Sequence, residues 1–359
     1  MNIVVLGLSL SSSWGNGHAT TYRALLAAMA ARGHDILFLE RDRPWYADNR
    51  DLKVPDFCRL RYYNEVADLA EWREEIAGAD AVIVGSYVPD GIAVGRFVQE
   101  TARGATAFYD IDTPVTLAAL ERGTCDYVSR DLIAGYDCYL SFTGGPTLQR
   151  IEQEFGSPSA RALFCSVDTD RYRPLDVPKR WDLSYLGTYS DDRQPGLERL
   201  LIEVARRCPD RRFAVAGSQY PDSIDWPRNV ERVDHLPPAE HAAFYSASRF
   251  TLNLTRADMI EAGWSPSVRL FEAGACGTAI LSDRWPGIGV LFEPNHEVVL
   301  VDDTKDVLAA LELDTSSRGG ALRDRIVRDH SAARRAEQLE DILNGLRGAE
   351  NRAPAMVAS

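Results

Sequence analysis

The sequence predicts an α/β protein made of two doubly wound domains. Short apolar segments alternate with segments whose apolar residues recur every three or four positions, as expected for parallel strands joined by helices. The alternation stops at about residues 165 to 181, where SVDTDRYRPLDVPKRW has two prolines and no period, and then it restarts. A chain of 359 residues is long enough for two ordinary hydrophobic cores.

The first domain is expected over residues 1–170. Its opening segment NIVVLGLSL predicts a strand, SSSWGNGH a turn and ATTYRALLAAMAARGH a helix. Further strands are expected at 81–86, 105–110 and 138–142, and helices at 65–77, 91–102 and 146–155. RDRPWYADNRDLK and CRLRYY are interpreted as solvated loops, with an acceptor rim or a membrane-facing surface as the alternatives.

The second domain is expected over residues 171–325. Its predicted strands are 182–187, 212–217, 229–233, 249–255 and 278–283, and its predicted helices are 195–207, 238–247 and 267–275. A charged amphipathic helix follows at about 318–345, and we expect its part from 326 to 347 to pack back toward the first domain. The last residues, 348–359, have no apolar period and are predicted to be disordered.

The composition limits the partners and the compartment. With 40 basic and 53 acidic residues the formal net charge is −13, which disfavours nucleic acid as a partner. The six cysteines form no CxxC pair, so neither a zinc site nor a thiol-exchange motif is indicated. Neither a basic segment before the first apolar stretch nor a run of 18 apolar residues occurs, so we expect a cytoplasmic protein without a transmembrane segment.

Two clusters of polar residues follow strands of the first domain, where ligands bind in open parallel sheets. In WGNGHATT, Gly15 and Gly17 permit a tight turn, and His18 falls in the first turn of a helix, as a general base or as a packing residue. In YDIDTP, the spacing of Asp110 and Asp112 predicts that both carboxylates lean to one face. They could orient a histidine, accept a proton, hold a sugar hydroxyl or cap the next turn.

Two more clusters follow strands of the second domain. In LGTYSDDRQPGLERL, Gly187, Thr188 and Arg193 could donate to a diphosphate, or Arg193 could pair with Asp191 or Asp192. In AGWSPSVRLFEAGACGTAILSD, Ser267 begins a helix that carries Arg269 and Glu272. Glu272 could accept both hydroxyls of a ribose, or the two charged side chains could form an i,i+3 ion pair.

Together these segments resemble the spore-maturation (CgeB-type) branch of the group 1 glycosyltransferases, which have the GT-B fold. The resemblance extends from Met1 to about residue 345 and is most specific in RLFEAGACG and WGNGHATTYRALLAAMAARGH. It implies two Rossmann-like domains facing an interdomain cleft, with the nucleotide sugar on the second and the acceptor on the first. Glu272 matches the glutamate that holds the ribose, but Trp264 stands where the wider group often has the first glutamate of an E-x7-E pair.

The implied reaction is metal-independent transfer of a hexosyl group from a nucleotide-diphosphate sugar to an acceptor hydroxyl, without a cofactor. With inversion, His18 would deprotonate the hydroxyl; with retention, His18 and the aspartates would only position it. The acceptor, whether saccharide, lipid-linked or small molecule, stays open. The expected catalytic residues are His18, Asp110 and Asp112. The expected donor-binding residues are Gly187, Thr188, Arg193, Gly217, His235, Leu236, Ser267, Arg269 and Glu272. The expected acceptor-binding residues are Gly15, Asn16, Gly17, Ser86, Thr113, Gly144 and Gly145.

Two other functions fit the same sequence. The first is a nucleotide-sugar epimerase or hydrolase on this fold, in which nucleotide would be released without an acceptor. The second is a nucleotide-sugar-binding protein without catalysis. Replacing His18 and Glu272 separately distinguishes an enzyme from a binding protein. An enzyme should lose turnover with the first replacement and donor affinity with the second, whereas a pure binding protein has no turnover to lose.

Overall fold

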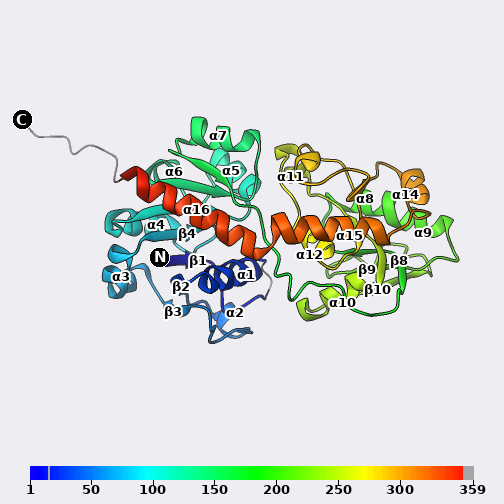
Figure 1. The fold of residues 1–359 in the computed structure, drawn as a ribbon, viewed down its shortest axis with the longest axis horizontal. Coiled ribbons are helices and arrows are strands. Elements are labelled where there is room, and N and C mark those ends of the chain that lie inside the picture. Colours follow the sequence, from blue (N-terminus) through cyan, green and yellow to red (C-terminus); the bar gives the residue numbers. More distant parts are fainter. Residues whose placement is uncertain (15–16, 351–359) are drawn as a thin grey trace, which may run out of the picture. The chain divides into compact units, whose positions relative to one another are not determined.

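The computed structural model describes residues 1–14 and 17–350, which divide into two compact units (Figure 1). Unit 1 consists of Met1–Cys165 and the C-terminal segment from Ala332, and unit 2 is Ser166–Ser331. The chain therefore leaves unit 1 slightly before residue 170 and returns to it slightly after residue 325. The predicted acceptor residues Gly15 and Asn16 and the tail from residue 351 lie outside the described residues.

In the described part of the chain, unit 1 contains a seven-stranded parallel sheet in the order β3-β2-β1-β4-β5-β6-β7. Its strands are β1 (Asn2–Gly7), β2 (Asp35–Arg41), β3 (Arg59–Tyr63), β4 (Ala81–Gly85), β5 (Ala105–Asp110), β6 (Cys138–Ser141) and β7 (Ala160–Ala162). The inner strands are almost continuously apolar because helices cover both faces of the sheet.

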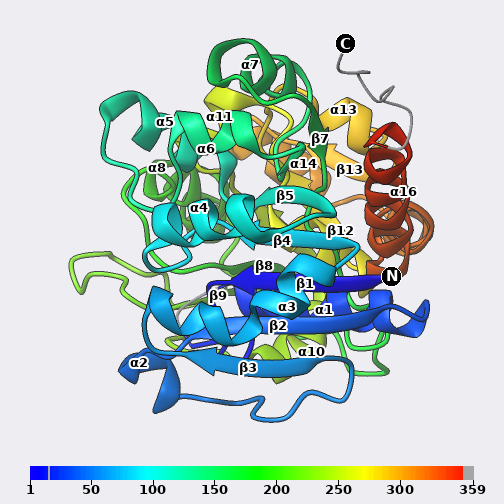
Figure 2. The same ribbon diagram turned by 90° about the vertical axis from the view of Figure 1, so that its left-hand side faces the viewer.

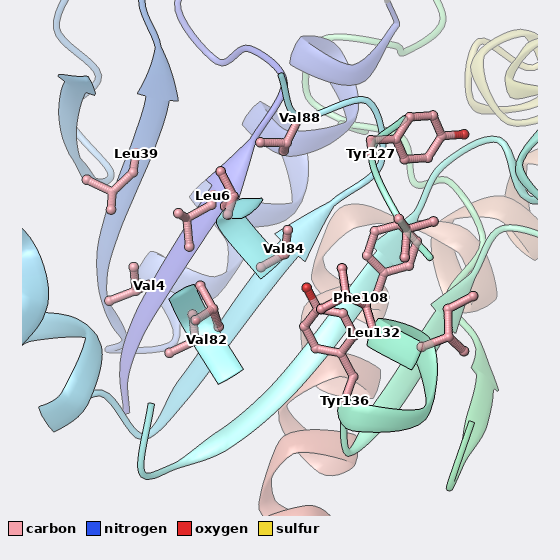
Figure 3. Close-up of a cluster of buried hydrophobic side chains, with 14 of the residues drawn as sticks. Val4, Leu6, Leu39, Val82, Val84, Val88, Phe108, Tyr127, Leu132 and Tyr136 are labelled. Carbon is pink, nitrogen blue, oxygen red and sulfur yellow. The ribbon is translucent and has the colours of Figure 1, made fainter. Parts of the chain in front are cut away.

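The helices of unit 1 lie on both faces of this sheet. They are α1 (His18–Ala31), α2 (Pro44–Ala47), α3 (Arg73–Gly78), α4 (Gly91–Thr101), α5 (Thr113–Arg122), α6 (Arg130–Gly135), α7 (Pro146–Phe155) and α16 (Ala332–Glu350), with a 3-10 turn at Val66–Trp72. Helices α3 and α4 cover one face (Figure 2). Between that face and its helices lies an apolar core that includes Val84, Phe108 and Leu132 (Figure 3).

Helix α16 belongs to unit 1 although it ends the described chain. It packs against α1, and the Nε of Arg32 donates to Glu340 at 2.7 Å. Gln338 donates to the carbonyl of Ala162 at 2.7 Å, which ties the helix to edge strand β7. The predicted continuous helix at 318–345 is wrong, because α15 (Ser316–Arg325) and a π-helical turn (Ile326–His330) end at Ser331, whose backbone is extended.

Some elements of unit 1 differ from the prediction. The interpretation of CRLRYY as a solvated loop is wrong, since Arg59–Tyr63 forms β3 and pairs with β2. An edge strand exposes alternate residues, and in this segment two of the exposed residues are arginines. The segment therefore has the charged composition of a surface loop although it forms a strand. Strand β2 and helices α5 and α6 were also not predicted.

In the described part of the chain, unit 2 contains a six-stranded parallel sheet in the order β10-β9-β8-β11-β12-β13. Its strands are β8 (Trp181–Leu186), β9 (Phe213–Ala216), β10 (Val230–Val233), β11 (Ser248–Asn253), β12 (Ala279–Ser282) and β13 (Val298–Leu300). Its helices, besides α15, are α8 (Gln194–Leu197), α9 (Glu203–Arg207), α10 (His241–Ser246), α11 (Ala257–Ala262), α12 (Val268–Ala275), α13 (Ile288–Leu291) and α14 (Thr304–Ala310), with a π-helical segment at Glu198–Ile202 and a 3-10 turn at Pro238–Glu240.

The strand order places a switch point in each sheet. In unit 1, β1 pairs with β2 on one side and β4 on the other, and in unit 2, β8 pairs with β9 and β11. The loops that follow neighbouring strands at such a point diverge to opposite faces and leave room for a ligand. The loops before α1 and α8 are therefore the places to look for chemistry. Among the described residues, no helix has the length and apolar character needed to cross a membrane.

Candidate functional site

Arg193 stands at the beginning of α8 and pairs with no carboxylate of the residues that the structure describes. Its Nη2 donates to the carbonyl of Thr188 at 2.8 Å, and its buried Nε has no hydrogen-bond partner among the described residues. Asp191 instead accepts from Tyr189, and Asp192 accepts from the backbone N–H of Ala257. The alternative that Arg193 pairs with Asp191 or Asp192 is therefore wrong. Burial lowers the pKa of Arg193, and the nearby positive charge of Arg269 lowers it further.

Arg269 lies in the first turn of α12 and is buried. Its Nε donates to the carbonyl of Leu186 at 2.7 Å, and its Nη1 donates to Oδ1 of Asn253 at 3.1 Å. Within the described chain it forms no ion pair, so the predicted alternative of a bridge to Glu272 is also wrong. The hydrogen-bond partners of Arg269, which include the hydroxyl of Ser267 at 3.5 Å, are neutral. Its charge also acts on the carboxylate of Asp283, which forms no ion pair with it among the described residues: burial raises the pKa of Asp283, and Arg269 opposes this rise.

Glycines let the loops after β8 and β9 approach this guanidinium. A Cβ on Gly187 would lie 2.9 Å from Nη2 of Arg269 and 2.7 Å from the hydroxyl oxygen of Tyr185. Gly217 has a φ of +143°, and a Cβ there would meet the carbonyl oxygen of Gly187. Any larger residue at these positions would displace the arginine or separate the two loops.

Aromatic residues and a third arginine brace the same loops. Tyr220 donates its hydroxyl proton to the carbonyl of Gly187 at 3.0 Å. The guanidinium carbon of Arg232 lies 4.3 Å from the centre of the Tyr220 ring and 4.6 Å from that of Trp226. Arg232 also donates to the carbonyl of Gly217 at 3.1 Å. These three side chains were not predicted, because their spacing matches no motif.

Glu272 lies on the same helix as Arg269, and its side chain is 12% exposed. Its Oε2 is 3.8 Å from Nδ1 of His241, and the hydroxyl oxygen of Tyr172 is 3.5 Å from the same nitrogen. Burial raises the pKa of Tyr172, and the negative charge of Glu272 raises it further. Nε2 of His241 is 3.2 Å from the carbonyl oxygen of Leu236. His241 thus links Glu272 to the loop of Leu236 and the exposed His235.

The turn before α12 is held by a helix cap and by the indole of Trp264. Ser267 caps the helix by accepting from the backbone N–H of Arg269 at 3.3 Å. Trp264 has a φ of +45°, and its backbone N–H donates to the carbonyl of Pro286 at 2.6 Å. Gly287 lies against its indole, where a Cβ would be 2.4 Å from Cγ of the ring. An aromatic ring therefore packs against the loop of Gly287 shortly before α12.

In unit 1, His18 and Asp112 form a pair. His18 is the first residue of α1 and is buried, and its Nε2 lies 3.6 Å from Oδ2 of Asp112. The edge of its ring faces Tyr87, with the centroids 5.5 Å apart, and its buried Nδ1 has no hydrogen-bond partner among the described residues. The side chain of Asp112 is 33% exposed, so the carboxylate is the accessible end of this pair.

Asp110 faces a different environment. It is fully buried, accepts from the hydroxyl of Thr116 at 2.8 Å, and is hydrogen-bonded by the hydroxyl of Tyr139. Burial raises its pKa to about 6 against the opposing effect of these hydrogen bonds. The prediction that Asp110 and Asp112 share a face is wrong, because β5 ends at Asp110 and the backbone turns before Asp112.

Other predicted acceptor residues are engaged in local structure. The hydroxyl of Ser86 accepts from the backbone N–H of Ile111 at 3.1 Å, and the hydroxyl oxygens of Thr113 and Ser141 are 2.8 Å apart. Gly17 and Gly145 precede the first residues of α1 and α7, and Gly144 is buried beside Gly145.

One group of side chains in the described chain has the geometry of a metal site. Glu293, His296 and Glu297 each bring a ligand atom within 4.8 Å of the others. Glu297 already accepts from Arg325 at 2.9 Å and from the backbone N–H of Glu293 at 2.7 Å. Hydrogen bonds within the protein therefore hold Glu297 in this cluster. None of the three residues is among those predicted for the catalytic, donor or acceptor site.

Comparison with known families gives a match, which covers most of unit 2 and the start of α16. Residues 193–341 are similar to a family described as glycosyl transferase-like. The matched residues begin at Arg193 and include Arg269 and Glu272. No curated protein sequence matches the chain.

Solved structures similar to the chain include glycosyltransferases that carry both units. Sucrose-phosphate synthase from Thermosynechococcus elongatus has a TM-score of 0.68 and 15% identity, over 97% of this chain and 100% of that one. Anabaena HepE in complex with UDP and glucose has a TM-score of 0.67 and 12% identity, over 96% and 100%. AviGT4, a glycosyltransferase of avilamycin A biosynthesis, has a TM-score of 0.65 and 15% identity, over 97% and 98%. These similarities confirm the predicted fold class, GT-B with two Rossmann-like domains.

Proposed function

We propose that this protein transfers a glycosyl group from a nucleoside-diphosphate sugar to an acceptor hydroxyl. Unit 2 binds the donor and unit 1 binds the acceptor. The match of residues 193–341 to a glycosyl transferase-like family supports the reaction class. HepE, which shares the fold, is described in complex with UDP-glucose, and this supports a nucleotide sugar as the donor. Within this class we place the chain in the CgeB-type branch, with a hexosyl donor.

The observation that carries the proposal is that neither Arg193 nor Arg269 forms an ion pair within the described part of the chain. Both guanidinium groups are at least partly buried, and both donate only to neutral oxygens. Burying a cation without a counter-charge is costly, so such a site is stabilised by an anion that brings its own charge. A diphosphate fits this requirement, because Arg binds phosphate oxygens with charge-assisted hydrogen bonds.

The same arrangement suits the departure of the nucleotide. Negative charge grows on the diphosphate as its bond to the anomeric carbon breaks, and donors already in place stabilise that charge without reorganising. Arg193 and Arg269 supply this stabilisation together with the N-terminal amides of α12. No metal ion is required in this scheme, so transfer in the presence of a chelator is part of the proposal.

Glu272 is proposed to hold the ribose of the donor. An ionised carboxylate accepts hydrogen bonds from two neighbouring hydroxyl groups, as an acidic residue does in dinucleotide-binding sites. His241 and Tyr172 restrict its orientation. The loop of His235 and Leu236, which His241 also contacts, is proposed to line the nucleobase.

The acceptor is proposed to bind at the pair His18–Asp112. The exposed carboxylate of Asp112 can accept a hydrogen bond from the attacking hydroxyl, and the buried imidazole fixes the carboxylate. If the anomeric configuration inverts, this pair takes the hydroxyl proton; if it is retained, the pair orients the acceptor only.

The test measures UDP-glucose binding and nucleotide release with and without a panel of saccharide, lipid-linked and small-molecule acceptors. Transfer predicts release that depends on one acceptor and matches the product formed. Stoichiometric release without any acceptor would instead indicate a hydrolase. Binding without any turnover would indicate a nucleotide-sugar-binding protein.

A further inference from the structure

The carboxylate of Glu40 fills a ring of hydrogen-bond donors in the loop after β1. Its Oε2 accepts from two successive backbone N–H groups, Leu10 at 2.6 Å and Ser11 at 2.8 Å. Its Oε1 accepts from the hydroxyl of Ser11 at 2.6 Å. The hydroxyl of Ser9, 3.3 Å from Oε1, shares its proton with the closer carbonyl of Ser12 at 3.0 Å. Glu40 is fully buried, so these donors replace its water.

This carboxylate is held by dipoles rather than by an ion pair. Among the described residues no Lys or Arg forms a salt bridge with it. Arg50 reaches it only through Ser11, whose hydroxyl oxygen accepts from Nε of Arg50 at 3.3 Å. Arg50 itself pairs with Asp42 at 2.8 Å. Two successive amides that converge on one oxygen form an anion-binding nest, a feature that also binds phosphate groups.

The nest lies in the loop after β1, the first strand of unit 1. The loop after the first strand of a Rossmann-like sheet is where phosphate groups of nucleotides commonly bind. We propose that Glu40 is an internal anion that occupies this nest and excludes phosphate from unit 1. The β1 loop then serves uncharged hydroxyl ligands, and Glu40 is a specificity-determining residue. This inference stands on the contacts of Glu40 and does not depend on the proposed function.

The outer side of the loop is fixed independently of Glu40. Asp51 accepts from the backbone N–H of Ser13 at 3.0 Å and forms a two-fold hydrogen bond with Arg23, at 2.6 and 3.0 Å. Nε of Arg23 also donates to the carbonyl of Leu10 at 2.9 Å. Because these contacts remain when Glu40 is removed, the donors should keep their arrangement around an empty, anion-sized space.

The experiment uses the Glu40→Ala variant of the full chain and two probes, acetate and inorganic phosphate. Thermal unfolding is followed as each probe replaces chloride at constant ionic strength. A ligand that binds only the native state raises the unfolding midpoint in a saturable way. We expect Glu40→Ala to unfold at a lower temperature than the wild type and to be stabilised by either anion more than the wild type is. The response of the wild type measures anion binding elsewhere, including at Arg193 and Arg269, and is the baseline for the variants.

Two control variants separate nest filling from other effects. Asp68 also takes two successive amides on one oxygen, from Asn64 at 2.9 Å and Glu65 at 3.1 Å, but it is only half-buried, whereas Glu40 is fully buried. Asp68→Ala should therefore respond no more than the wild type, since water takes the place of the carboxylate. Glu40→Gln keeps the space filled and should also respond no more than the wild type. An equal response of Glu40→Ala and Asp68→Ala, or a response of Glu40→Ala no larger than that of the wild type, would overturn the inference.

If Glu40→Ala does not fold, a measurement on the wild type tests the same inference. The amide resonances of Leu10 and Ser11 are followed by NMR while inorganic phosphate is added. The inference predicts that these two resonances do not move. A saturable shift at both of them would show that phosphate enters the nest and would overturn it. Neither experiment uses turnover, so a failure here is distinct from a failure of the proposed transferase reaction.

Discussion

The guanidinium of Arg269 lies over the ring of Tyr185, with its carbon 4.8 Å from the ring centre, and not against a carboxylate. Stacking on an aromatic face stabilises a cation partly and uses none of its N–H donors. Nε and Nη1 donate to Leu186 and Asn253, while Nη2 has no hydrogen bond to a described residue and can donate to an anion. This relationship separates the two charged residues of α12. Arg269 faces the loop after β8, while Glu272 faces His241.

Replacing Arg269 with Gln should weaken donor binding more than it weakens the fold. The loss of a charge-assisted hydrogen bond predicts a fall in UDP affinity of about 10-fold to 100-fold. The free energy of unfolding should change little, because the variant also removes a buried charge that forms no ion pair with a described residue. Calorimetric titration and denaturant unfolding measure the two quantities. A large loss of stability with unchanged UDP affinity would make Arg269 a structural residue.

The role of Glu272 is testable with a modified ligand. The wild type should bind UDP more tightly than 2′-deoxy-UDP by about 1–3 kcal/mol, since a missing hydroxyl leaves the carboxylate without a partner. In Glu272→Ala this difference should disappear, while His241→Ala should reduce it only in part. If Glu272→Ala still discriminates between the two nucleotides as the wild type does, the carboxylate does not contact the ribose.

Replacing Asp112 with Asn should reduce turnover without reducing donor affinity. The substitution removes the accessible charge beside His18, and we expect transfer to slow by about 10-fold to 100-fold through lost orientation of the acceptor. Asp126→Asn, which changes an exposed carboxylate of the same unit, is the matched control. Steady-state kinetics and UDP titration of each variant provide the comparison, and equal rates for the two variants would argue against the pair.

The buried Asp110 should make the stability of the protein depend on pH. Its pKa is raised from 3.8 to about 6, so the folded state binds a proton more tightly than the unfolded state. The resulting stabilisation is complete below pH 3.8 and is lost as the pH rises through about 6. We expect the wild type to lose about 1–3 kcal/mol relative to Asp110→Asn over this interval. If the free energies of unfolding of the two proteins change with pH in the same way, Asp110 does not titrate in this pH interval.

Transfer should also proceed in the presence of EDTA. The proposed stabilisation of the leaving diphosphate comes from arginine and backbone donors, so chelation should leave the rate unchanged. Restoration of a lost rate by added Mg²⁺ or Mn²⁺, after chelation has abolished it, would require a metal in the mechanism.

Local sequence patterns were sufficient for the central strands of the two sheets and for the residues that follow them, but not for strands β2, β3, β7 and β13. Arg193 and Glu272 stand out in the sequence because each lies close to a predicted strand. Arg193 comes between the strand segment that ends in Gly187 and the next predicted helix, and Glu272 lies in the predicted helix directly before the apolar segment 278–283. The contacts of these residues were not predictable in the same way. His241 and Tyr172 meet Glu272 only through the fold, since they come from separate elements that no periodicity connects.

Glu40 shows the same limit more clearly. It is a single carboxylate within the apolar segment DILFLER, and its partners lie about thirty positions earlier in the chain. Nothing in this segment predicts that the carboxylate of Glu40 is buried or that backbone N–H groups donate hydrogen bonds to it. The edge strand β3 was missed because it is short: the alternation of exposed Arg59, buried Leu60 and exposed Arg61 extends over only three residues.

The most direct test of the donor site is the affinity for UDP of the wild type, Arg193→Ala and Arg206→Ala, measured by calorimetry at two salt concentrations. Arg206 belongs to the next helix and is paired with Glu198, so its removal should leave UDP binding unchanged. We expect Arg193→Ala to bind UDP at least about 10-fold more weakly than the wild type and with a smaller dependence on salt. Equal affinities for all three proteins would contradict the claim that unpaired arginine holds the diphosphate.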